Sequence, residues 1–118
     1  MDQVDIADRR REYAGLLEQS LTRLVDVLKQ RDDVLRISVF GSYARGRRDL
    51  FTDLDILVVM QTATPFLQRQ QELYSALALP VDLDLLCYTP DEFEALKDRP
   101  FLRHALTTEK VLYEKKSS

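Results

Sequence analysis

Cysteine and histidine are nearly absent from this chain of 118 residues, which contains one of each. A single cysteine cannot form a disulfide within the chain, and this predicts a protein of a reducing compartment, the cytoplasm. A structural zinc site needs about four nitrogen or sulfur ligands. The chain offers only Cys87 and His104, which are too few for such a site. Apolar runs stay far below the roughly 18 residues that span a bilayer, and no signal-peptide-like stretch is seen. We therefore expect no membrane contact.

Positively charged residues are also fewer than negatively charged ones: the chain has 17 Lys+Arg and 20 Asp+Glu, and its net charge is −3. That balance disfavours a protein that wraps nucleic acid directly, since such a protein needs a basic face. It does not exclude a small phosphate-bearing ligand held through metal ions. With 45% hydrophobic residues the chain can build a core. Its length predicts one domain over residues 1–118, with a frayed tail at 114–118.

Hydrophobic periodicity predicts helices that alternate with short strands. An amphipathic helix is expected within the first thirty residues and a short helix and loop at 43–49. Further helices are expected from 65 to about 79, from 89 to about 97 and from 100 to about 107. The expected strands are 34–40, 54–60, 81–88 and a small edge strand at 110–113. This order predicts a mixed α/β (α+β) domain in which helices cover a short sheet.

Aspartate is disfavoured inside strands, yet two predicted strands carry an Asp-x-Asp pair. These pairs are Asp53 with Asp55 and Asp82 with Asp84. Since side chains alternate across a strand, both members of a pair point to the same face. Adjacent strands would bring three or four carboxylates together, and proton sharing or a hard cation such as Mg²⁺ relieves their repulsion. The alternative is that each aspartate pairs with an arginine or caps a turn.

A glycine-serine turn, Gly41-Ser42, ends the first predicted strand, and ten residues separate Ser42 from Asp53. Backbone N–H groups and the serine hydroxyl can face an anion at such a turn. Arg45, Arg47 and Arg48 follow as a local basic cluster. They either contact phosphates or an acidic partner, or form a solvated loop.

Together these residues resemble the minimal nucleotidyltransferases of the DNA polymerase beta superfamily. The matching pattern is Gly41-Ser42, ten residues, then Asp53-x-Asp55 and an apolar strand. The third carboxylate of that family comes from a later strand. We favour Asp84 for it, because the segment that follows is an apolar strand ending in Thr-Pro, and Asp82 remains the alternative.

This resemblance implies a short mixed sheet flanked by helices, the nucleotidyltransferase (polymerase beta-like) fold. It implies transfer of a nucleoside monophosphate, AMP from ATP above all, to an acceptor hydroxyl with two Mg²⁺ ions. Asp53, Asp55 and Asp84 would be the catalytic and metal-binding residues. Gly41, Ser42 and Arg45 would hold the phosphates.

Family members of this size commonly accompany a HEPN-domain protein. By analogy, the expected acceptor is a tyrosine of a HEPN toxin, with this chain as the antitoxin of a toxin–antitoxin pair. A partner or a second copy would complete the acceptor site, which makes an oligomer of either kind an expectation. Two alternatives stay open: a non-catalytic module that neutralises its partner by binding, and a small-molecule transferase, like those that modify aminoglycosides, that needs a partner subunit.

Overall fold

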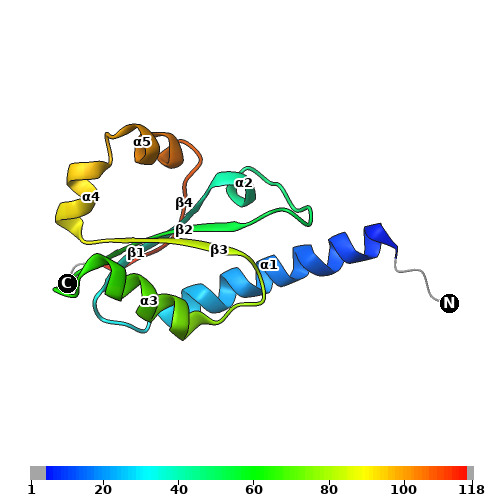
Figure 1. Ribbon diagram of the computed structural model, residues 1–118, viewed down its shortest axis with the longest axis horizontal. Helices are drawn as coiled ribbons and strands as arrows, with labels where there is room; N and C mark the ends of the chain where they lie inside the picture. The colour runs from blue at the N-terminus through cyan, green and yellow to red at the C-terminus, as the bar shows by residue number, and fades with distance from the viewer. Residues whose placement is uncertain (1–4, 117–118) are drawn as a thin grey trace.

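A computed structural model describes residues 5–116 of the chain (Figure 1). Its elements in order are α1 (Ile6–Leu28), β1 (Val34–Phe40), α2 (Gly41–Ala44), β2 (Leu54–Met60), α3 (Phe66–Leu77), β3 (Leu83–Tyr88), α4 (Pro90–Leu96), α5 (Pro100–Leu106) and β4 (Lys110–Glu114). Both β1 and β2 have the bounds predicted from the sequence. Within the described residues, no helix is both long and apolar enough to cross a membrane.

The four strands form one mixed sheet in the order β3-β2-β1-β4. Strand β1 is antiparallel to both of its neighbours, β2 and β4. Strands β2 and β3 are parallel, and α3 is the crossover that parallel neighbours require. The predicted mixed sheet flanked by helices is confirmed.

Helices cover both faces of the sheet, α1 and α3 on one side and α4 and α5 on the other (Figure 1). The first face holds the larger core, where Leu17 and Leu24 of α1 meet alternate strand residues such as Ile37 and Ile56. The second face is covered only in part, and its smaller cluster includes Leu57 and residues of α5. Part of this second face is therefore left for polar side chains of the strands.

The third strand begins at Leu83, two residues later than predicted. The chain leaves α3 through Ala78, whose φ of 42° is left-handed, and then passes Pro80, which has no N–H to donate to a sheet. Residues 80–82 are used to turn the chain back toward the sheet. The hydrophobic alternation that includes Val81 does not indicate that these residues form a turn.

The C-terminal strand continues further than expected. Glu114 pairs with Arg36 in the register of β1 and β4, and the Lys115 N–H donates to the Leu35 carbonyl at 2.9 Å. The fraying expected from residue 114 therefore does not begin there, because β1 offers the backbone partners that order these residues. Residues 117–118 of the predicted tail lie outside the described residues.

Polar side chains of α3 close the outer edge of β3. The Gln70 carboxamide donates to the Leu85 carbonyl at 2.7 Å and accepts from the Cys87 N–H at 2.8 Å. The Tyr74 hydroxyl accepts from the Leu85 N–H at 2.8 Å and donates to the Leu83 carbonyl at 3.1 Å. These groups take the places that a further strand would fill, so this edge is protected from pairing with another chain.

Arg69 of α3 joins three elements. Its side chain is buried, donates to the carbonyls of Thr64 at 3.0 Å and Cys87 at 3.2 Å, and forms an ion pair with Glu92. Glu92 in turn accepts from the Thr89 N–H at 2.9 Å in the capping box that begins α4. The guanidinium therefore fixes α3, β3 and α4 relative to one another.

We expect Arg69→Ala to lower the free energy of unfolding by about 3 kcal/mol, because buried carbonyls and a capping carboxylate lose their donor. Urea denaturation measures the change. Arg11→Ala is the matched control, since Arg11 pairs with Asp8 on the exposed surface of α1, where ion pairs contribute about 0–1 kcal/mol. Equal effects of the two substitutions would contradict a joining role for Arg69.

Candidate active site

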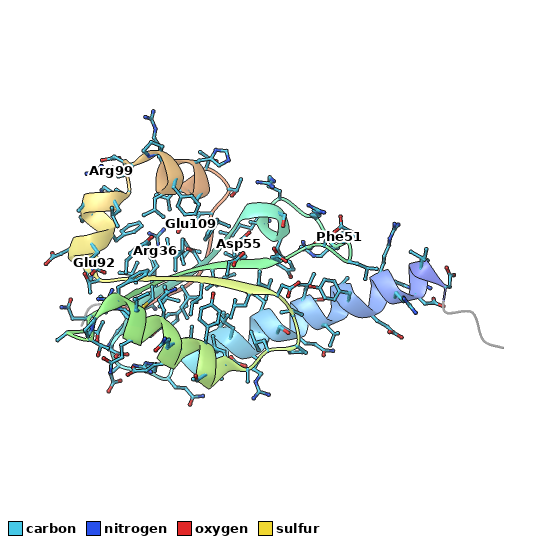
Figure 2. All side chains as sticks on the ribbon, viewed as in Figure 1. Arg36, Phe51, Asp55, Glu92, Arg99 and Glu109 are labelled. Atoms are coloured by element: carbon cyan, nitrogen blue, oxygen red, sulfur yellow. The ribbon has the colours of Figure 1, made fainter. Side chains whose placement is uncertain are left out.

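Asp55 and Asp84 are neighbours on adjacent parallel strands. The register of β2 and β3 pairs them directly, so both point to the face that α4 and α5 cover only in part. Figure 2 shows Asp55 near the middle of the molecule, close to where β1 leads into α2. The structure thus brings together one carboxylate from each Asp-x-Asp pair.

Asp53 and Asp82 lie just before their strands, which begin at Leu54 and Leu83. The Leu54 N–H donates to the Asp82 carbonyl at 2.9 Å, which holds the two strand entries side by side. Burial and the negative charges of Asp82 and Asp84 raise the pKa of Asp53 above its ordinary value. The two residues form an outer acidic pair beside the inner pair of Asp55 and Asp84.

The inner pair carries uncompensated negative charge. Burial, then the charge of Asp84 and a hydrogen bond to it, raise the pKa of Asp55 from 3.8 to about 6. Arg45 acts in the opposite direction and lowers that pKa. A carboxylate in such surroundings holds a proton readily, or a cation in its place.

Gly41 makes room for the Asp55 carboxylate. Its φ of +71° is left-handed, and a Cβ added to it would lie 2.1 Å from Asp55 Oδ2 and 3.0 Å from Asp55 Cγ. Any other residue would therefore displace the carboxylate as well as strain the backbone. Glycine at this position is required by the close approach of the turn to β2.

The segment after α5 is fixed to the same face. Thr108 Oγ1 accepts the Gly41 N–H at 3.0 Å, so this N–H, which was expected to face a phosphate, is engaged within the protein. Glu109 accepts from Arg36 and Ser38 of β1, each at 2.6 Å; Figure 2 shows Arg36 and Glu109 side by side. Sequence reasoning missed Thr108 and Glu109, because no motif marks the end of a short helix as part of a site.

The three arginines of the basic loop have different partners. Arg47 pairs with Asp49 at 2.6 Å. Arg48 lies over the Tyr43 ring, with Cζ 3.5 Å from its centroid, and donates to the Tyr43 carbonyl at 2.8 Å. Arg45 is exposed and, in the described part of the chain, makes no side-chain hydrogen bond or ion pair. Of the cluster, Arg45 is the cation free to meet a ligand beside the carboxylates.

A pocket of about 400 Å³ opens beside the carboxylate pair. It is bounded by the strand ends, by α3 and by α5, and its lining residues are Phe40, Asp55, Tyr74, Asp84, Leu85, Leu86 and Phe101. Tyr74 and Phe101 were not singled out from the sequence, since exposed aromatic residues on amphipathic helices are common. Their place at the site follows from the tertiary arrangement alone.

The oxygen donors at this site suit magnesium. No group of three histidine, cysteine, aspartate or glutamate side chains in residues 5–116 is arranged to hold a metal. Mg²⁺ nevertheless usually binds through one or two carboxylates and completes its shell with water and substrate phosphates. The mutually repelling oxygens of Asp55 and Asp84 meet that requirement.

Comparison with known families decides the classification. The model of the family described as "Polymerase beta, Nucleotidyltransferase" matches residues 22–118, which include the whole sheet and the carboxylates. The chain belongs to this nucleotidyltransferase family. Within it, the predicted place among the minimal nucleotidyltransferases is confirmed by a curated relative. Protein adenylyltransferase MntA of Thermococcus cleftensis is 37% identical over 70 residues, which cover 57% of this chain and 71% of the relative.

Solved structures show the same fold at low sequence identity. A candidate nucleotidyltransferase from Sulfolobus solfataricus superposes with a TM-score of 0.56 and 16% identity, covering 98% of this chain and 93% of the other. A chain of a mutant MntA-HpeT toxin-antitoxin structure gives a TM-score of 0.53 and 24% identity, with 84% and 73% coverage. A toxin-antitoxin structure with AMP-PNP gives 0.50 and 24%, with 84% and 74% coverage. This nucleotidyltransferase therefore has the fold of its family over most of its length.

We expect Gly41→Ala to reduce nucleotidyl transfer at least 100-fold, because its Cβ would push the Asp55 carboxylate out of place. Gly46→Ala is the control: Gly46 also has a positive φ, of +100°, but a Cβ there would meet nothing within 4 Å. Each substitution should cost about 1–2 kcal/mol of backbone strain. Transfer assays beside urea denaturation separate the two effects, and a similar loss of transfer in Gly46→Ala would contradict the steric explanation.

Asp55→Asn should stabilise the metal-free protein at pH 8. The pKa of Asp55 is raised in the folded state, so its ionisation destabilises that state as the pH rises from 3.8 through about 6. The full shift corresponds to about 3 kcal/mol, and partial exposure reduces the expected gain to about 1–2 kcal/mol. Denaturation curves in EDTA at pH 8 and pH 4 measure it. A gain that is as large at pH 4 as at pH 8 would disprove the electrostatic origin.

Proposed function

We propose that this nucleotidyltransferase transfers AMP from ATP to a hydroxyl group on a partner protein. The observation that carries the proposal is the inner carboxylate pair, Asp55 and Asp84, placed against the Gly41 turn. The similarity to an adenylyltransferase that acts on protein supports both the nucleotide and the class of acceptor.

In this proposal Asp53, Asp55 and Asp84 would hold two Mg²⁺ ions, with water and the phosphates of ATP as the remaining ligands. Asp84 is preferred over Asp82 as the third carboxylate, because it lies in register with Asp55 whereas Asp82 precedes the strand. When bound, Mg²⁺ neutralises phosphate charge and makes the acceptor hydroxyl more acidic. Asp84 is also suitably placed at the rim of the pocket to accept the hydroxyl proton.

Ser42 of the Gly41-Ser42 turn and the free cation of Arg45 hold the outer phosphates of ATP, since the Gly41 N–H is engaged with Thr108. The acceptor oxygen attacks the α-phosphorus, the bond from that phosphorus to the β-phosphate oxygen breaks, and pyrophosphate leaves with both electrons of the bond. The protein contributes positioning and charge neutralisation, which are the main sources of catalysis in phosphoryl transfer. Thr108 keeps the turn in place through its bond to the Gly41 N–H.

The acceptor in this proposal is a tyrosine of a HEPN-domain toxin in the cytoplasm, which makes the chain an antitoxin. Support comes from the name of the curated relative and from the toxin-antitoxin assemblies in which chains of this fold occur. A module that only binds its partner has no use for two repelling carboxylates, which lower its own stability. The site therefore favours catalysis over stoichiometric neutralisation.

The test is to incubate the chain with Mg²⁺, α-labelled ATP and the product of the neighbouring gene. We expect label on a tyrosine of the partner, located by mass spectrometry, and at least a 1,000-fold loss in Asp53→Ala/Asp55→Ala. Asp26→Ala/Asp98→Ala removes two exposed aspartates elsewhere and should retain full transfer. If the active-site double variant neutralises the partner as well as the wild type and no label is transferred, the enzymatic role is wrong.

A further inference from the structure

The pocket lies across the carboxylates, from Phe40, the residue before the glycine turn, to Tyr74 beyond β3. Across the sheet, Gly41 at the end of β1 is followed by Asp55 on β2 and Asp84 on β3. Beyond β3 comes α3, from which Tyr74 reaches the edge of the sheet. The pocket therefore spans both carboxylates, and its Tyr74 end lies beyond β3, away from the turn.

In-line displacement places the attacking and leaving oxygens on opposite sides of the phosphorus. This step rests on the proposed function, in which the outer phosphates of ATP lie at the Gly41-Ser42 turn. The α-phosphorus then lies by Asp55 and Asp84, and the attacking oxygen must approach from the far side, over β3. That position is the end of the pocket at Tyr74, beyond β3.

The walls of the pocket are apolar and aromatic. Among the described residues that line it, Asp55 and Asp84 carry the charge, while Phe40, Leu86 and Phe101 offer carbon surface. Phe101 of α5 is 63% exposed and so offers a large apolar area at the pocket. A pocket for a cationic sugar would need polar groups around its rim. A pocket for a flat ring with one hydroxyl group needs carbon walls and a carboxylate at one end.

We propose that this pocket binds the phenol ring of the acceptor tyrosine, with Phe101 and Tyr74 as its two aromatic walls. A phenol also suits the chemistry, because its ordinary pKa of about 10 lies far below that of an aliphatic alcohol. Its hydroxyl points at Asp84, loses its proton there and attacks the α-phosphorus.

Tyr74 itself is a wall and not the acceptor. Its hydroxyl already donates to the Leu83 carbonyl and accepts from the Leu85 N–H, which fixes the ring and occupies the oxygen. Phe101 has no such anchor and can adjust to the incoming ring. The two walls thus differ in function, one rigid and one adaptable.

Binding of N-acetyl-L-tyrosinamide to the chain saturated with Mg²⁺ and α,β-methylene ATP tests the pocket. In NMR titrations we expect shifts at Leu86 and Phe101, and a dissociation constant that rises about tenfold in Phe101→Ala. Phe101→Leu should recover part of the affinity. The matched control is Phe51→Ala, which removes an 81% exposed phenylalanine outside the pocket and should change the constant less than twofold. Shifts confined to other surfaces, or equal effects of the two alanine variants, would overturn the proposal.

Transfer assays separate this proposal from the function on which it rests. N-acetyl-L-tyrosinamide, N-acetyl-L-serinamide and kanamycin are offered with α-labelled ATP, and Phe101→Ala should raise the KM for the tyrosine probe while leaving the KM for ATP within twofold. Transfer to kanamycin or serinamide in preference to the tyrosine probe refutes the phenol pocket and leaves AMP transfer intact. Failure of the wild-type chain to bind ATP in the presence of Mg²⁺ refutes the proposed function instead.

Discussion

Electrostatic repulsion between Asp55 and Asp84 is the constraint on which the rest of the site depends. The parallel register of β2 and β3 forces the two carboxylates together, and the partial burial of Asp55 weakens the screening of their repulsion by water. Neighbouring features act on this one pair: Gly41 leaves space for it and Arg45 opposes its charge. A site held at this electrostatic cost is prepared for a cationic ligand before any substrate arrives.

The framework that holds the pair in position comes from distant parts of the chain. Arg69 connects α3 and α4 behind β3, and Glu109 connects the segment after α5 to Arg36 and Ser38 of β1. The short helices α4 and α5 contribute few core residues, so such polar contacts fix their position over the sheet. Phe101, carried on α5, is thereby placed relative to the carboxylates although the two are far apart in sequence.

Local patterns were sufficient to predict most of the fold and the centre of the site. The bounds of β1 and β2 follow from runs of apolar and β-branched residues, and the Asp-x-Asp pairs are visible because aspartate is rare in such runs. What the sequence could not reveal are relations between segments. The direct pairing of Asp84, the residue favoured from the sequence, with Asp55 depends on strand register. The late start of β3 depends on the turn at Ala78, and Thr108 reaches Gly41 only through the tertiary fold.

The hydroxyl of Tyr74 serves the edge of β3, while its ring faces the pocket. Changing this residue would therefore open a sheet edge at the same time as it reshaped the site, with the attendant risk of edge-to-edge association. Phe101 has no such structural role, because its side chain is largely exposed on the surface of α5. Under the proposed role of the pocket, acceptor preference among related chains should diverge through the position of Phe101, while Tyr74 of α3 stays constant.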